Sequence, residues 1–339
     1  MTGPWIAISS PGRVAPDRGT KSRGQSGKGT REGVTPRMIP GGPLCLLLAF
    51  LVLLAAPQPV RAARQEPALR VTDRFSLEVT VQRMVASHTS YEFGNPFPPQ
   101  QTPLSRLEFP LDSWWAGAEL RAEFPRFAAG FEALTNLSRE TEGRMHDSDW
   151  DDEAEPQRKT IFSASRSRLE PSYLLRAHVE LKVSDWLELP DWLDLRPVAG
   201  VRRQRFSFVT HDGTQWDLTG QEPPYPLPGD GIAFEQVFSH YFVGLRAALD
   251  LAKPAWMDRL TALVQADWAY VEGRNRDHHL LRQGERYTFE DTNGHAWHAS
   301  IGLRAGLTER LSLAAEADLL AIETRGEHRL VNSPLGIDF

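Results

Sequence analysis

The chain has 339 residues, enough for one or two domains, and a formal net charge of −6 at pH 7. Its one cysteine, Cys45, lies in a segment that we expect to be removed, which excludes disulfides, a cysteine nucleophile and a thiolate metal site from the mature chain. Residues 63–339 hold 30 basic and 42 acidic side chains, a net charge of about −12, so we do not expect nucleic acid as a partner.

The N-terminal part has the pattern of a secretory signal. The apolar run Pro43–Pro57 is too short and too early to be a convincing spanning helix, and compact residues, Val60 and Ala62, stand where a signal peptidase reads. We therefore predict cleavage after Ala62. The expected divisions are a disordered extension or untranslated stretch before Met38 (1–37), a signal peptide (38–62) and the mature domain (63–339).

Apolar and polar residues alternate along much of the mature chain. In Tyr173–Val183 the odd positions are apolar, whereas Arg176, His178 and Glu180 occupy even positions. A period of two places successive side chains on opposite faces of a strand. The same alternation predicts strands over Phe75–Val81, Leu260–Tyr270, Trp297–Leu307 and Leu311–Ala321.

The length and chemistry of these runs favour a membrane barrel. A tilted strand of about 9–11 residues crosses a bilayer, and these runs reach that length. A soluble antiparallel sandwich also alternates, but here the second face is charged, as in the wet interior of a small barrel. Aromatic residues also gather near run ends, as interfacial girdles require: Trp114, Trp115, Trp186, Trp192, Trp256, Trp268 and Tyr270. We predict an all-β fold, an antiparallel up-and-down transmembrane β-barrel.

The links between runs alternate in length, which orients the predicted barrel. Short links are expected near 125–126, 186–192, 253–257 and 306–309. Longer, polar links are expected near 90–104, 142–165, 211–232, 274–286 and after Arg325. In outer-membrane barrels the long links face outside, so that end would hold any site open to the medium.

One candidate site is the sequence Asp277-His278-His279. If the alternation of Leu260–Tyr270 continues without a bulge, Asn275, Asp277 and His279 point into the lumen and His278 points outward. A carboxylate beside an imidazole fixes its tautomer and stabilises the imidazolium, which makes a general base. The alternative is a hydrogen-bonded polar loop at the barrel rim.

A second candidate lies in Met145–Glu153, which is rich in carboxylates. Asp147 and Asp149 share one face of a strand, and neighbouring carboxylates raise each other's proton affinity. A solvated acidic loop is the plainer interpretation. A calcium loop is disfavoured because the spaced ligands and the glycine turn are missing, and we expect no metal site.

Four stretches together resemble the omptins, outer-membrane endopeptidases of Gram-negative bacteria built as ten-stranded barrels. The resemblance runs from about Phe75 to Arg325. It is carried by HTSYEF with the downstream LSRLEF, by MHDSDWDD, by YVEGRNRDHH and by AGVRRQRFSF. The first three occur in the family's order at the expected long-link end, and the last resembles the family's fifth strand.

The resemblance implies a role for each matching residue. Asp277 and His279 would form the dyad that activates a water, and Asp147 and Asp149 would hold that water from across the mouth, with no acyl-enzyme. Glu92 would be the acid of the S1 pocket. It also falls on the polar positions of its run if the alternation of Phe75–Val81 continues.

The sequence departs from the family at several positions. Asn275 stands where typical omptins have a second S1 aspartate, and no acid stands near Ile161. Of the lipopolysaccharide-binding set, Arg205 fits. Three other positions do not fit, namely Val201, Arg203 and Val237. No tenth alternating run follows Leu311–Ala321, so the closing strand is expected to be missing.

The resemblance implies an outer-membrane endopeptidase that cleaves next to basic residues, and the departures imply relaxed selectivity. We expect a monomer whose active site faces outside, with a peptide or protein substrate and no cofactor. Lipopolysaccharide is a candidate activating lipid. The alternative is a non-enzymatic barrel, an adhesin or structural protein with a degraded site. A lipid-modifying enzyme is disfavoured because no Ser or His is expected at the lipid-facing rim.

Overall fold

In the computed structural model, the described residues are 3–4, 8–11, 74–95, 100–282, 286–332 and 337–338. The chain divides into two compact units, and all described residues belong to the unit that comprises Met1–Pro16 and Val71–Phe339. The predicted signal peptide and its cleavage site lie outside the described residues. Of the predicted extension, two short segments are described, as strands β1 and β2.

The described part of the chain is built from strands that join in one sheet of sixteen. Their bounds are β1 Gly3–Pro4, β2 Ile8–Pro11, β3 Phe75–Val85, β4 His88–Phe93, β5 Ser105–Pro110, β6 Ser113–Glu123, β7 Phe127–Asn136, β8 Met145–Asp149, β9 Ile161–Leu169, β10 Tyr173–Leu181, β11 Leu193–Asp217, β12 Tyr225–Asp250, β13 Arg259–His279, β14 Arg286–Gly306, β15 Ser312–Asn332 and β16 Ile337–Asp338.

Strands β3 to β15 form an antiparallel up-and-down meander. Four long runs are broken near their middle into β3 with β4, β5 with β6, β7 with β8 and β9 with β10, whereas β11 to β15 are unbroken. The first break is at Ala86, which has a left-handed φ of 50°. Asp112, at the break of the next run, accepts hydrogen bonds from the N–H groups of Ala86 and Ser87 at 3.1 and 2.7 Å.

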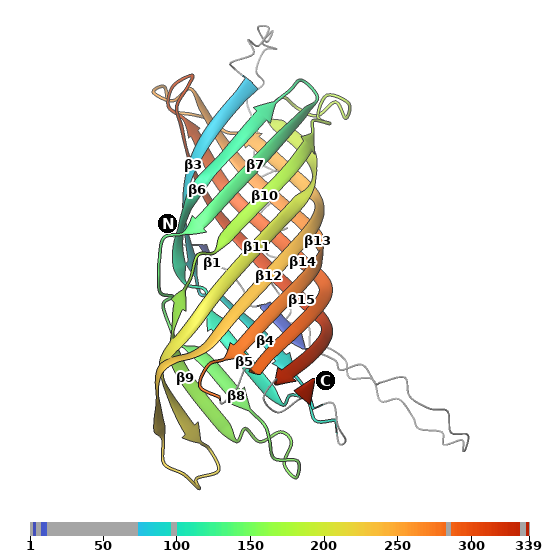
Figure 1. Ribbon diagram of the computed structural model, residues 1–339. Coiled ribbons are helices and arrows are strands. Elements are labelled where there is room, and N and C mark those ends of the chain that lie inside the picture. Colours follow the sequence, from blue (N-terminus) through green and yellow to red (C-terminus); the bar gives the residue numbers. More distant parts are fainter. Residues whose placement is uncertain are drawn as a thin grey trace, which may run out of the picture. The chain divides into compact units, whose positions relative to one another are not determined.

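The alternation predicted from the sequence is present in the strands. Along β13, exposed and buried residues follow each other strictly from Gln265 to Asp277. Large apolar side chains such as Val243, Trp268 and Trp297 are exposed on the outer face. Figure 1 shows the short links gathered at one end of the meander and β4, β5, β8 and β9 near the other. The chain therefore has the predicted all-β fold, an antiparallel up-and-down barrel of the membrane type.

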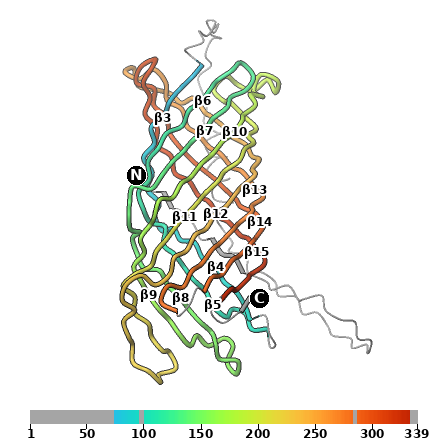
Figure 2. The backbone as a smooth tube through the Cα atoms, in the orientation of Figure 1, coloured from blue at the N-terminus to red at the C-terminus, as the bar shows by residue number. Residues whose placement is uncertain are grey.

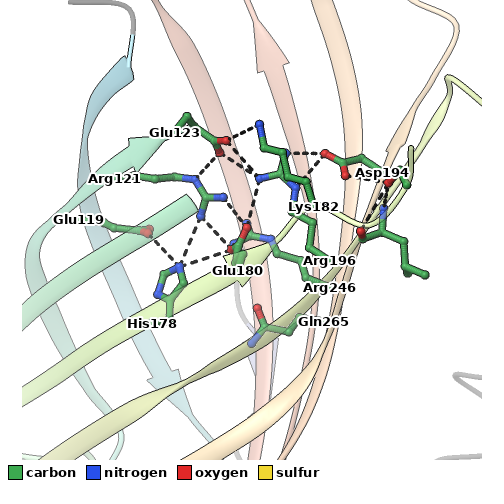
Figure 3. A network of polar contacts seen from close by, with 12 residues as sticks. Glu119, Arg121, Glu123, His178, Glu180, Lys182, Asp194, Arg196, Arg246 and Gln265 are labelled. Atoms are coloured by element: carbon green, nitrogen blue, oxygen red, sulfur yellow. Dashed lines mark hydrogen bonds and ion pairs between the residues drawn. The ribbon is translucent and has the colours of Figure 1, made fainter. Parts of the chain in front are cut away.

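Charged side chains line the lumen near the short links, as the polar face of the runs predicts (Figure 3). Glu180 of β10 is fully buried and is paired with three guanidinium groups, including Arg246 at 2.9 Å and Arg196 at 3.2 Å. Lys182 and Glu123 extend the network at 2.9 Å. A buried charge is tolerated where opposite charges compensate its lost hydration, so these pairs hold β6, β10, β11 and β12 together from inside.

The long links are shorter than the sequence predicts, because strands continue into them. β11 and β12 extend to Asp217 and from Tyr225, inside the predicted link 211–232, and β8 and β9 occupy much of the predicted link 142–165. Figure 2 shows the β11–β12 hairpin, in yellow, extending past its neighbours. Beyond the bilayer neither face is required to be apolar, so hydrogen-bonded pairing persists after the alternation fades.

Short segments lie along the outer edge of β15. β16 pairs with it in antiparallel fashion at Val331 and Asn332, and β2 pairs with it in parallel at Ile322 and Glu323. β2 also pairs with β4. The sequence predicts no closing strand after β15, and the described residues there form the two-residue strand β16. None of the described residues forms a helix long and apolar enough to cross a membrane.

Candidate active site

A layer of apolar side chains lies in the lumen beneath the long-link end. Phe109 of β5 stacks on Phe234 of β12 and Phe208 of β11, with ring centroids 4.5 and 5.0 Å apart, and all three rings are buried. Tyr91 of β4 stacks on Phe234 at 5.2 Å. Side chains between this layer and the long links therefore have apolar neighbours on one side, and electrostatic interactions there are stronger than in water.

The mouth of the barrel is the part of the lumen between this apolar layer and the long links. The dyad residues Asp277 and His279 point into it. His279 places Nε2 2.9 Å from Oδ2 of Asp277, and Asp277 is 1% exposed. His278 faces the other way and stacks on Tyr287 at 4.1 Å. The predicted separation of the two histidines is confirmed, because β13 contains no bulge between Tyr270 and His279.

The mouth lies well beyond the lipid-facing surface. Tyr270 of β13 and Tyr241 of β12 are exposed, and their rings are 6.4 Å apart, as in an interfacial girdle. His279 follows Tyr270 by nine residues along the same strand. At the rise and tilt of a barrel strand this places His279 roughly 20 Å farther from the membrane.

Tyr91 is a site residue that the sequence did not single out. Its hydroxyl donates a hydrogen bond of 2.7 Å to Oδ2 of Asp277, the oxygen that also faces His279. Burial raises the pKa of Tyr91 well above its ordinary value, and the neighbouring Asp277 carboxylate raises it further. Tyr91 therefore remains a neutral donor, and its contact joins β4 to β13 across the mouth.

Asp147 and Asp149 of β8 face the same mouth. Burial raises the pKa of Asp147 to about 7, with a further contribution from Asp149, and burial also raises the pKa of Asp149. His279 interacts electrostatically with both carboxylates. Oδ1 of Asp147 and Oδ1 of Asp277 are buried without a hydrogen-bond donor from the described residues. The predicted acids and the dyad thus form one electrostatic cluster. The two Oδ1 atoms in it can still accept hydrogen bonds from a water or a substrate.

Two arginines at the rim were also missed from the sequence. Arg282 follows β13, and its positive charge lowers the pKa of both Asp147 and Asp149, against the effect of burial. Arg286 begins β14 and interacts with Asp277, Tyr91 and Asp149, while burial and Arg282 lower its own pKa. The mouth is therefore acidic at its centre and has cations at its edge.

Glu92 does not lie where the sequence predicts. Its carboxylate pairs with Arg106, whose guanidinium also lies over the Trp150 ring at 5.5 Å. The break at Ala86 shifts the alternation by one position, so that Tyr91 and not Glu92 points into the mouth. The expectation that Glu92 continues the polar face of β3 is wrong for this reason.

Asn275 has an acidic neighbour that the sequence analysis did not identify. Asn275 donates a hydrogen bond of 2.7 Å from Nδ2 to Oε2 of Glu290, directly opposite on β14. The other oxygen of Glu290 lies 3.1 Å from Nδ1 of His328 on β15. Glu290 is 4% exposed. A carboxylate is therefore present beside Asn275, although it comes from a different strand.

Arg205, expected to contact lipopolysaccharide, lies on β11 with partners of its own. Its guanidinium pairs with Glu235 and donates to the carbonyl of Pro171 at 2.9 Å. The nearby Arg203 donates to the Ser239 hydroxyl at 3.2 Å. Across the described ranges, no three His, Cys, Asp or Glu side chains are grouped to hold a metal ion.

The fold and the site define an outer-membrane type of barrel whose mouth holds a carboxylate–histidine pair facing two further acids. The chain belongs to the omptin family, outer-membrane proteases, because that family's model matches residues 121–336. Its fold is similar to that of the outer membrane protease OmpT from Escherichia coli, with a TM-score of 0.66 and 14% identity over 79% of this chain and 89% of that one. A comparison with curated proteins gives no significant match.

Proposed function

We propose that the protein is an endopeptidase of the bacterial outer membrane that hydrolyses peptide bonds with an activated water. One observation carries the proposal: buried Asp277 and half-buried His279 face two half-buried acids, Asp147 and Asp149, that interact with the same histidine. Membership of the omptin family supports it. The mouth lies at the long-link end, which faces the medium in such barrels.

In the proposed reaction His279 is the general base. Asp277 holds Nε2, so Nδ1 takes the proton from water as the water oxygen attacks the carbonyl carbon. Asp277 stabilises the imidazolium that forms. The tetrahedral intermediate then collapses, the C–N bond breaks, and the proton passes from His279 to the leaving amine.

Asp147 and Asp149 act as a pair that shares a proton near neutral pH. Asp149 raises the proton affinity of Asp147, and carboxylates that interact in this way titrate as a unit. A protonated carboxyl donates a hydrogen bond and an ionised one accepts, so the pair can hold the attacking water and then the developing oxyanion. This role requires no covalent intermediate.

The proposed substrate is a peptide or protein cleaved next to a basic residue, with relaxed selectivity. An acidic mouth attracts cationic side chains and raises the rate of encounter. We further propose that the barrel acts as a monomer without a cofactor. Lipopolysaccharide is its proposed lipid neighbour, with Arg205 on the outward-facing side of β11 as one contact.

A barrel that binds ligands without cleaving them is the alternative, and one observation favours it. Arg282 and Arg286 bring two cations to the acidic cluster, and Arg286 interacts with the dyad carboxylate itself. Cations at this position would compete with a basic substrate. The alternative, an adhesin or structural barrel with a degraded site, predicts no hydrolysis of cationic peptides.

The proposed activity is tested with fluorogenic Arg-Arg and Arg-Ala peptides and protein refolded in lipopolysaccharide micelles. His279→Ala should abolish cleavage, whereas His278→Ala should retain it, because His278 points away from the mouth and stacks on Tyr287. The two variants remove the same side chain from adjacent positions. Cleavage that persists in His279→Ala contradicts the proposal.

A further inference from the structure

We propose that Arg286 is a further catalytic residue, which binds the oxyanion of the tetrahedral intermediate. This inference rests on the proposed endopeptidase function and deepens it. When the water oxygen bonds to the carbonyl carbon, the π electrons of the carbonyl move onto its oxygen and the water proton goes to His279. A negative charge thus develops in the mouth, and a cation or donor placed there in advance stabilises it.

Arg286 stands beside His279 at the mouth end of two paired strands. The antiparallel ladder of β13 and β14 ends with His278 opposite Tyr287. One further step in the same register brings Arg286, the first residue of β14, next to His279, the last residue of β13. Opposed residues on neighbouring strands have Cβ atoms about 4.5–5.5 Å apart, so the two side chains leave the sheet side by side.

The side chain of Arg286 points into the mouth. The following residue, Tyr287, stacks on the outward-facing His278 at 4.1 Å. The residue after that, Thr288, is buried and lies opposite Asp277 on the inward face. Since side chains alternate along a strand, Arg286 shares the inward face with Thr288.

The guanidinium of Arg286 lies among carboxylates and keeps a donor without a partner. It interacts electrostatically with Asp277 of β13 and Asp149 of β8, which places it between the dyad and the acid pair. Its Nε is buried and has no hydrogen-bond acceptor among the described residues. A buried donor without an acceptor costs free energy. An oxygen that gains negative charge is the acceptor that suits it, because charge-assisted hydrogen bonds are the strong ones.

The charges of the mouth explain why the reaction would need this cation. In the intermediate the imidazolium of His279 compensates Asp277, and the pair Asp147 and Asp149, which shares a proton, keeps a negative charge. The oxyanion adds another close by, where repulsion is stronger than in water. Arg286 compensates for it. Because the compensation acts only once the oxyanion forms, it should raise kcat and not merely lower KM.

Steady-state kinetics on the Arg-Arg peptide is the first test. Arg286→Gln should lower kcat by about 100- to 1,000-fold, the usual cost of one lost oxyanion donor, while KM does not rise. Arg286→Lys should recover part of the loss, because the charge returns without the planar fork. Arg274→Gln is the matched control and should keep wild-type kinetics. It removes an exposed arginine on the outer face of β13, 3.3 Å from Asp291.

The affinity for an analogue of the intermediate is the second test. A peptide phosphonate carries tetrahedral, negatively charged oxygens at the scissile position, whereas a hydroxyethylene isostere is tetrahedral and neutral. Calorimetry in detergent compares both ligands on the wild-type chain and on Arg286→Gln. The phosphonate should lose affinity in proportion to kcat/KM, as a transition-state analogue does. The neutral isostere should bind both chains alike.

Chemical rescue separates binding of the oxyanion from a structural role. Arg286→Ala leaves room for a free guanidinium ion, so added methylguanidinium should restore part of kcat, whereas tetramethylammonium, which has no N–H donor, should not. If Arg286→Gln fails to fold, Arg286→Lys decides, because kcat and phosphonate affinity should fall together in it. A fall in one without the other overturns the inference.

The outcomes separate this inference from the proposed function. If the wild-type chain does not cleave the peptide, the proposed function fails. The calorimetry still decides on Arg286, because equal phosphonate affinity in Arg286→Gln overturns its role and a lower affinity keeps it as the ligand of the anionic oxygens. If cleavage depends on His279 but Arg286→Gln keeps the wild-type kcat, the inference is overturned and the function stands.

Discussion

Tyr91 of β4 donates its hydroxyl to the same carboxylate oxygen of Asp277 that faces His279, at 2.7 Å. That one oxygen is thus shared by two partners from opposite sides of the mouth. The second oxygen of Asp277 is buried and receives no donor from the described residues. The contact fixes the orientation of the carboxylate and makes Tyr91 a positioning residue for the proposed base.

Tyr91→Phe should therefore lower kcat while leaving KM nearly unchanged. The ring and its stacking on Phe234 remain, and only the hydrogen bond to Asp277 is lost. We expect a loss of about 10- to 150-fold in kcat, which corresponds to the roughly 1.5–3 kcal/mol of a hydrogen bond to a charged group. Steady-state kinetics on the Arg-Arg peptide measures it. An equal rise in KM with no change in kcat contradicts the positioning role.

The raised pKa of Asp147 predicts a pH-dependent stability. In the folded protein Asp147 keeps its proton up to about pH 7, whereas its ordinary pKa is 3.8. Between these values the folded state binds more protons than the unfolded state, so stability falls as pH rises. Asp147→Asn should consequently stabilise the protein at pH 8, by about 2–4 kcal/mol, and have little effect at pH 3.5.

Urea unfolding in detergent micelles at the two pH values tests the Asp147 prediction. Asp151→Asn is the matched control, because Asp151 is exposed in the link after β8. It should change the free energy of unfolding little at either pH. An equal gain at pH 3.5 and pH 8 in Asp147→Asn would show that burial does not hold the proton in place.

Breaking the charge network in the lumen should lower the free energy of unfolding strongly, although the network lies far from the candidate active site. Glu180→Gln leaves Arg121, Arg196 and Arg246 without their shared carboxylate in a buried place. Removing one partner of a buried charge network costs about 3–5 kcal/mol. The free energy of unfolding should fall by this amount, with the kinetics of the remaining folded protein unchanged.

Glu155→Gln provides the comparison for the lumen variant. Its ion pair with Arg158 at 3.3 Å is exposed, so its loss should cost less than about 1 kcal/mol. Equal losses in the two variants would mean that the lumen charges are hydrated like surface charges. Thermal or urea unfolding of both variants under one condition makes the comparison.

The sequence predicted the barrel and half of the site for a physical reason. The bilayer requires apolar side chains on one face, which imprints a period of two on every crossing strand. Because β13 is continuous, the alternation seen around Trp268 continues to His279. It therefore correctly predicted that Asp277 and Asn275 face the lumen. The same argument failed at Glu92, because the chain breaks at Ala86, a residue type that rarely adopts a left-handed φ.

Contacts between strands could not be read from one sequence. Tyr91 meets Asp277, and Glu290 meets Asn275, only through the register of pairing and the curvature of the sheet. Local alternation says which way a side chain points, but not which residue it meets. For the same reason the cations Arg282 and Arg286 became visible only with the fold.

The central claim is that Asp277 and His279 act as one unit on a water held in the acidic mouth. The most direct measurement is kcat/KM of Asp277→Asn, His279→Ala and the double variant on the Arg-Arg peptide. We predict that each single variant loses at least about 100-fold and that the double variant is little worse than His279→Ala, because residues that act together are not additive. Losses that multiply independently, or single variants with wild-type activity, would contradict the claim.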